Sequence, residues 1–247
     1  MGQGAPGVSI FGDVVRWFLN PAHYQGSSGV PNRILEHLLM SGAALAASAL
    51  IALPIAILLG HYRKGGAVAI NISNIGRAIP SFAILVVAVQ VVGIGARPAF
   101  LALVALGIPP ILTNTYIGLS EVSPELREAA RGLGMTGRQV LWRVELPIAA
   151  PLIMAGIRTS AVQVVATATL AAEVAWGGLG RFIIDGFSQQ DNVQIFAGAI
   201  LVALVATAVE RGLEAVQQAV TPAGMRAPSR GPGRQQTLAS QAGVKAA

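Results

Sequence analysis

Residues 128–147 read EAARGLGMTGRQVLWRVELP, a polar, arginine-rich segment with long apolar runs before and after it. The whole chain of 247 residues is 53% hydrophobic and only 11% charged, with a mean hydropathy of +0.63. Soluble domains carry about 25% charged residues. A chain with this few charges could not cover a globule of its size with a polar surface. The composition therefore excludes an ordinary soluble protein.

Five apolar runs are long enough to span a bilayer, which needs about 20 residues per helix. They occupy 38–59, 78–96, 98–120, 149–175 and 193–209, and Arg158 and Glu173 interrupt the fourth. The predicted fold is therefore all-α: a polytopic membrane helix bundle of about five transmembrane helices, in which every backbone polar group is satisfied within a helix.

The chain divides into three predicted parts. Residues 1–33 form an extracytoplasmic N-terminal segment whose amphipathic piece, 10–19, is too short to span. The membrane domain occupies 34–220 and includes the polar loop 121–148. Residues 221–247 are Pro, Gly, Arg, Gln and Ala without periodicity, which predicts a disordered tail.

Arginine and lysine predict the orientation, because cytoplasmic loops carry the excess of positive charge. One side holds Arg63, Lys64, Arg77, Arg127, Arg131, Arg138, Arg143 and the basic residues of the tail, and the other holds Arg16, Arg33, Arg97 and Arg181. The N-terminus is therefore expected outside, and the polar loop and C-terminus in the cytoplasm. This topology accounts for the net charge of +6 without a nucleic-acid partner.

The polar loop has the signals of two short helices. Ser123 and Pro124 start the first, Gly134 ends it, and Thr136 can cap a second over 137–144. We expect Leu146-Pro147 to turn the chain back to the membrane. The small residues of the first helix suit the groove of a partner protein. On physical grounds alone, a helix resting on anionic lipid headgroups is an equal alternative.

The loop also resembles a known motif. The series Glu128-Ala129-Ala130, three residues, Gly134, nine residues, Val144, one residue, Leu146-Pro147 is similar to the EAA motif of ATP-binding-cassette importer permeases, with Val144 where isoleucine is usual. The resemblance implies a type I ABC importer transmembrane fold in a bacterial cell membrane. It also implies a coupling helix that docks on a cytoplasmic ATPase dimer and consists of Glu128, Ala129, Ala130, Gly134, Leu146 and Pro147.

Softer patterns resemble the osmoprotectant subfamily, which imports glycine betaine, choline or carnitine. They are Asn20-Pro21, Leu53-Pro54, RAIPS at 77–81, ATLAA at 168–172 and GGLG at 177–180, with Glu173 where an apolar residue is expected. The resemblance implies a second permease subunit, identical or paralogous, and an extracytoplasmic substrate-binding protein. Alternatives are an importer of another small solute, such as an amino acid, and a secondary transporter, although no internal repeat supports the latter.

Polar residues of the fourth run are candidates for the translocation path. Thr159, Gln163 and Thr167 recur every four residues beside Ser160, which makes a polar stripe on a helix. The stripe predicts either a path wall or hydrogen bonds between helices. Glu173 is a candidate outer gate or binding-protein contact, and Arg158 is expected to snorkel near a membrane face.

Several kinds of chemistry are absent from the sequence. It has no GxxxxGK[ST] loop, no metal-ligand spacing, no cysteine and no aromatic cluster in its spans. We therefore expect no enzyme and no cofactor in this chain, with ATP and Mg²⁺ used by the partner ATPase. Selectivity for a quaternary amine is expected to reside in the binding protein.

Overall fold

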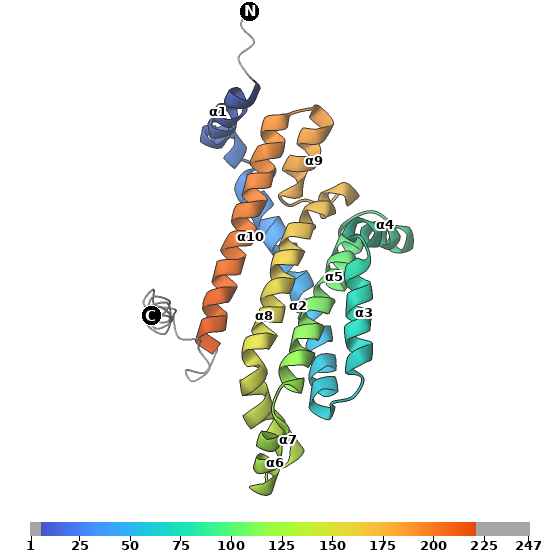
Figure 1. The fold of residues 1–247 in the computed structure, drawn as a ribbon. Coiled ribbons are helices and arrows are strands. Elements are labelled where there is room, and N and C mark those ends of the chain that lie inside the picture. Colours follow the sequence, from blue (N-terminus) through green and yellow to red (C-terminus); the bar gives the residue numbers. More distant parts are fainter. Residues whose placement is uncertain (1–5, 221–247) are drawn as a thin grey trace, which may run out of the picture.

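The computed structural model describes residues 6–220. It contains helices α1 (Pro6–Leu19), α2 (Val30–Tyr62), α3 (Gly66–Ala78), α4 (Ser81–Val92), α5 (Ala96–Ser120), α6 (Pro124–Gly132), α7 (Gly137–Val140), α8 (Leu146–Thr167), α9 (Gly180–Gln189) and α10 (Asn192–Val220). Two 3-10 helices, η1 (Pro21–Tyr24) and η3 (Ala168–Val174), and a π-helical turn, η2 (Leu141–Glu145), complete it. The described residues form no strand, so the all-α prediction is confirmed (Figure 1).

Four helical segments are long and apolar enough to cross a membrane: Val30–Tyr62, Ala96–Ser120, Gly137–Val174 and Asn192–Val220. The pair α3 and α4 is a fifth if it counts as one broken span. In Figure 1 the long helices run side by side, α1 and α9 lie at one end, and α6 and α7 lie at the other. The predicted domain boundary after residue 33 falls inside α2, and the predicted tail lies outside the described residues.

The second predicted span, 78–96, is not one straight helix. Helix α3 ends at Ala78, α4 begins at Ser81, and the two helices meet at 90°. Pro80 causes the break, because proline has no N–H to donate and disfavours helical geometry in the residue before it; Ile79 is accordingly extended. Helix α3 also includes the polar residues 71–77. Their low hydropathy had placed them between the predicted spans 38–59 and 78–96.

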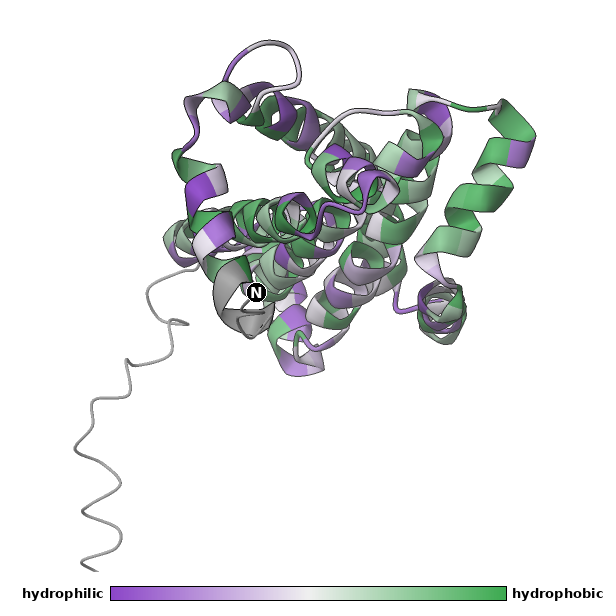
Figure 2. Ribbon diagram, turned by 90° about the horizontal axis from the view of Figure 1, so that it is seen from above, coloured by the Kyte–Doolittle hydropathy of each residue, from purple (hydrophilic) through white to green (hydrophobic). Residues whose placement is uncertain are grey.

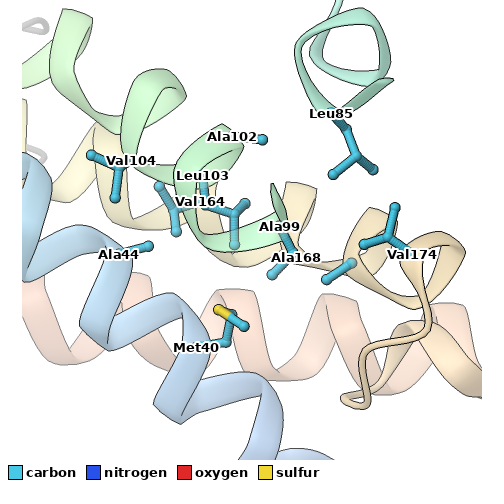
Figure 3. Close-up of a cluster of buried hydrophobic side chains, with 11 residues drawn as sticks. Met40, Ala44, Leu85, Ala99, Ala102, Leu103, Val104, Val164, Ala168 and Val174 are labelled. Atoms are coloured by element: carbon cyan, nitrogen blue, oxygen red, sulfur yellow. The ribbon is translucent and has the colours of Figure 1, made fainter. Parts of the chain in front are cut away.

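Helix α5 is the centre of the bundle and contacts α2, α3, α4 and α8. Its most apolar window is 56% buried, against 22% for each of the other long spans. Figure 3 shows Ala99, Leu103 and Val104 of α5 packed among side chains of neighbouring helices, including Met40 of α2 and Val164 of α8. The remaining faces are apolar and exposed, which fits contact with lipid.

Hydrophobic residues predominate along the long helices when the bundle is seen from above (Figure 2). Leu50 and Val91 are each 77% exposed and Leu204 is 60% exposed. Large exposed apolar surface on helices of this length is typical of a multi-pass membrane protein.

Candidate functional site

Helix α6 lies at one end of the bundle (Figure 1), and its two ends follow the predicted signals. The Ser123 hydroxyl accepts a hydrogen bond from Leu126 N at 3.2 Å, and Pro124 occupies the first turn. At the other end, Gly134 N donates to Arg131 O and Met135 N to Ala130 O, the pattern of a Schellman cap. Gly134 has a φ of 82°, which explains the need for glycine at this position.

The second helix of the loop starts as predicted but does not turn at Leu146-Pro147. Thr136 and Gln139 form a capping box at the start of α7. The chain then continues through the π turn η2 directly into α8, where Leu146 N donates to Leu141 O five residues back. Pro147 directly follows this π turn as the second residue of α8. A continuous helical segment therefore connects the loop to the membrane from Gly137 to Val174.

Helix α6 has two different faces. Arg127 and Ala130 are buried against the bundle, whereas Glu128 and Ala129 are exposed. Leu126 and Leu133, which share the side of Ala129 by helical spacing, are 43% and 81% exposed. We call Leu126, Glu128, Ala129 and Leu133 the docking face. An exposed apolar row beside a carboxylate suits insertion into a partner's groove.

The predicted coupling residues therefore do not form one surface. Glu128, Ala129 and Gly134 face outward, Ala130 faces the bundle, and Leu146 and Pro147 belong to the first turn of α8.

The buried side of α6 is held by three residues that sequence reasoning did not group. Glu145 is fully buried, and its Oε2 lies 2.6 Å from His61 Nδ1. Its Oε1 lies 3.2 Å from Arg127 Nε, forming an ion pair without an aligned hydrogen bond. We call Arg127, Glu145 and His61 the clasp. One sequence signal for it existed: an acid, Glu145, four residues before the apolar run 149–175.

Arg127 also binds backbone carbonyls at the ends of α2 and α5. Its Nη2 donates to Leu119 O at 2.6 Å and its Nη1 to His61 O at 3.2 Å. Burial lowers the pKa of the Arg127 guanidinium, and the Glu145 carboxylate acts against that shift. A displacement of α6 would therefore be transmitted at the same time to the ends of α2 and α5 and to the start of α8.

The polar stripe of α8 is divided among three environments. Thr159 and Gln163 line a cavity of about 400 Å³ between α8 and α10. Ser160 is fully buried and donates to Gly107 O of α5 at 2.9 Å, the kind of hydrogen bond that joins membrane helices. Thr167 lies beside α4 and α5, next to Ser81. The structure thus brings together Thr159 and Gln163 but not the other two.

Glu173 is exposed in η3, where it borders a cavity of about 220 Å³ with Phe82 and Val86 of α4. A different acid holds the neighbouring glycine-rich loop: Glu36 of α2 accepts hydrogen bonds from Gly178 N and Arg33 Nη1, both at 2.8 Å. A side chain at Gly177 would collide with the Glu36 carboxylate. The GGLG sequence therefore serves close packing at this end of the bundle.

Comparison with known proteins agrees with this architecture. Residues 52–222 match the family described as binding-protein-dependent transport system inner membrane component. A choline transport system permease protein of Bacillus subtilis is 39% identical over 191 residues, which cover 77% of this chain and 88% of the relative. A glycine betaine/carnitine/choline transport system permease protein of the same organism is 38% identical over the same shares.

A solved structure has the same fold. The methionine ABC transporter in inward-facing conformations superposes with a TM-score of 0.65 at 25% identity, covering 76% of this chain and 94% of that one. Because the family match spans more than half of the sequence and the relatives align along most of their length, the chain belongs to the family of inner membrane components of binding-protein-dependent transport systems.

Proposed function

We propose that the chain is the permease subunit of an ATP-binding-cassette importer that brings an osmoprotectant such as glycine betaine, choline or carnitine into the cell. The observation that carries the substrate class is the identity to permeases named for choline, carnitine and glycine betaine transport. The observation that supports the energy source is the exposed docking face of α6.

The docking face and the clasp suggest how work from the ATPase reaches the membrane. Closure of a cytoplasmic ATPase dimer would move α6 as a rigid body, and the clasp would pass that movement to α2, α5 and α8. Rigid-body rotation of helices about an interface is a common form of such transitions. ATP and Mg²⁺ belong to the partner ATPase, and this chain is proposed to need no cofactor or catalytic residue of its own.

The remaining partners follow from the same proposal. A second permease subunit, identical or paralogous, completes the pathway, and a substrate-binding protein delivers solute at the outer end. The N-terminus lies outside and the C-terminus in the cytoplasm, a proposal that rests on the arginine distribution. Helices α1 and α9 would then face the binding protein, since they lie at the end opposite α6 (Figure 1).

A second candidate substrate is an amino acid, because the methionine transporter has the same fold. Uptake distinguishes the two. The chain is expressed with its ATPase and binding protein in a bacterial host without osmoprotectant importers, and radiolabelled glycine betaine, choline, carnitine and methionine are supplied in turn. We expect uptake of at least one quaternary amine and none of methionine.

Charge reversal on the docking face tests the coupling part. Glu128→Arg should abolish uptake, whereas Glu121→Arg, at an exposed acid outside the docking face, should retain it. Uptake of methionine alone would reject the substrate class, and normal uptake by the Glu128 variant would reject the docking face.

A further inference from the structure

The cavity between α8 and α10 contains two opposite charges. Arg158, Thr159 and Gln163 of α8 line one side, and Glu210 of α10 lines the other. Its volume of about 400 Å³ falls within the range of about 300–1,000 Å³ that small-molecule sites occupy. Thr159 and Glu210 are exposed, so the cavity is open at the surface of this chain.

Both charges lie at the same level along the bundle. Gln217 Nε2 of α10 donates to Pro151 O of α8 at 3.1 Å, which fixes the register of the two antiparallel helices. Glu210 lies seven residues before Gln217 on α10, and Arg158 lies seven residues after Pro151 on α8. Both residues line the same cavity. Arg158 lies within the fourth apolar run, 12 residues beyond Leu146 and about 18 Å along α8. The prediction that its side chain snorkels to a membrane face stays a prediction.

Neither charge is paired within the described residues. Arg158 and Glu210 make no ion pair or hydrogen bond with each other or with any other side chain of residues 6–220. Arg158 interrupts the fourth apolar run, and an ionised side chain within a span marks a functional site by default. An arginine and a carboxylate that line one cavity from facing helices can bind the two opposite charges of one solute.

We propose that this cavity is a transit site for a zwitterionic solute, with Arg158 binding its carboxylate and Glu210 its quaternary ammonium group. Thr159 and Gln163 add hydroxyl and amide groups that can replace water around the solute. The proposal rests on the proposed function and narrows it to solutes of the betaine and carnitine type, which carry a carboxylate, over choline, which does not.

The natural absence of cysteine allows a direct test. Thr159→Cys is introduced into the full complex, purified in nonionic detergent without the binding protein. Its rate of reaction with a small thiol reagent is measured over a range of glycine betaine concentrations. Gln163→Cys is a second probe inside the cavity, and Thr207→Cys on the exposed side of α10, outside the cavity, is the matched control.

We expect glycine betaine to slow modification of Thr159→Cys at least threefold and saturably, with no effect on Thr207→Cys. Choline should protect less. Adding Arg158→Gln or Glu210→Gln should remove the protection while the cysteine remains reactive. Equal rates with and without glycine betaine at both cavity cysteines, or protection that survives both glutamine substitutions, would overturn the site. Failure of both cysteines to react would also overturn it, because the cavity would then be closed to solutes.

Uptake by the complex without an introduced cysteine is measured in parallel, so that failure of the transit site and failure of the proposed function can be told apart. Normal osmoprotectant uptake without protection rejects the transit site alone. Protection without any osmoprotectant uptake rejects the proposed transport function and leaves a zwitterion site.

Discussion

Replacing Glu145 by alanine removes the centre of the clasp. The Arg127 side chain is only 6% exposed, so its guanidinium would remain buried with no carboxylate beside it. Breaking a buried ion pair by removing one partner costs about 3–5 kcal/mol. Arg127 would keep its hydrogen bonds to Leu119 O and His61 O, which places the expected loss at the lower end, about 3 kcal/mol.

A double variant separates the charge effect from lost packing. In Arg127→Leu/Glu145→Leu no buried charge is left unpaired. Leu119 O keeps Val122 N as a donor, so the main cost is the His61 carbonyl, which loses its donor, about 1–3 kcal/mol. The double variant should therefore be no less stable than Glu145→Ala alone, the non-additive result expected of contacting residues.

The free energy of unfolding of the purified permease in mixed detergent micelles measures both effects. In the assembled complex, Glu145→Ala should also weaken the stimulation of ATP hydrolysis by loaded binding protein, because α6 is no longer fixed to α8. A Glu145→Ala protein within about 0.5 kcal/mol of wild type, the usual range for surface substitutions, would refute the claim that the clasp holds α6.

Three further outcomes are expected. Gly134→Pro should abolish uptake while the protein still inserts, because proline cannot adopt the φ of 82° at this residue. The control Gly132→Ala, where a Cβ meets nothing within 4 Å, should keep uptake. Normal uptake by both variants would contradict the claim that transport needs the bend at Gly134. Gly180→Ala should destabilise the permease by about 1–3 kcal/mol, because its Cβ collides with a backbone carbonyl of η3; the same measurement on Gly42→Ala, which has open space, should show no loss, and equal stabilities would refute the collision. Deletion after Thr221 should leave uptake unchanged, and loss of uptake at normal expression would instead reveal a role for the tail.

The local signals of the sequence were sufficient for the ends of the loop helices. Ser123, Gly134 and Thr136 act through atoms within a few residues of themselves, so their side-chain chemistry decides the caps wherever the helices pack. The long apolar runs likewise predicted the helix bundle, because the need for spans of sufficient length depends on hydropathy alone.

Sequence reasoning missed one polar helix and one π turn. Helix α3 carries exposed Asn71, Asn74 and Arg77, so its apolar average is too low to recognise it as part of a span. Leu146-Pro147 looked like a turn because proline ends helices more often than it continues them. The π turn before it keeps the segment helical, and nothing in the residue types announces that hydrogen-bond pattern.

The clasp and the charged cavity could not be predicted because both join distant residues. His61 and Glu145 are 84 residues apart in sequence. Arg158 and Glu210 line one cavity only because α8 and α10 pack in the register that places them opposite each other. Charges within apolar runs were visible in the sequence, but their partners depend on how the helices pack.

ATP-dependent uptake into proteoliposomes tests the central claim most directly. The complete complex is reconstituted with ATP on the side of the ATPase, and radiolabelled glycine betaine is supplied with the binding protein on the other side. Accumulation against a gradient is expected only with hydrolysable ATP, and Glu128→Arg should abolish it. Accumulation that persists without ATP, or that an ion gradient alone drives, would contradict an ATPase-coupled permease.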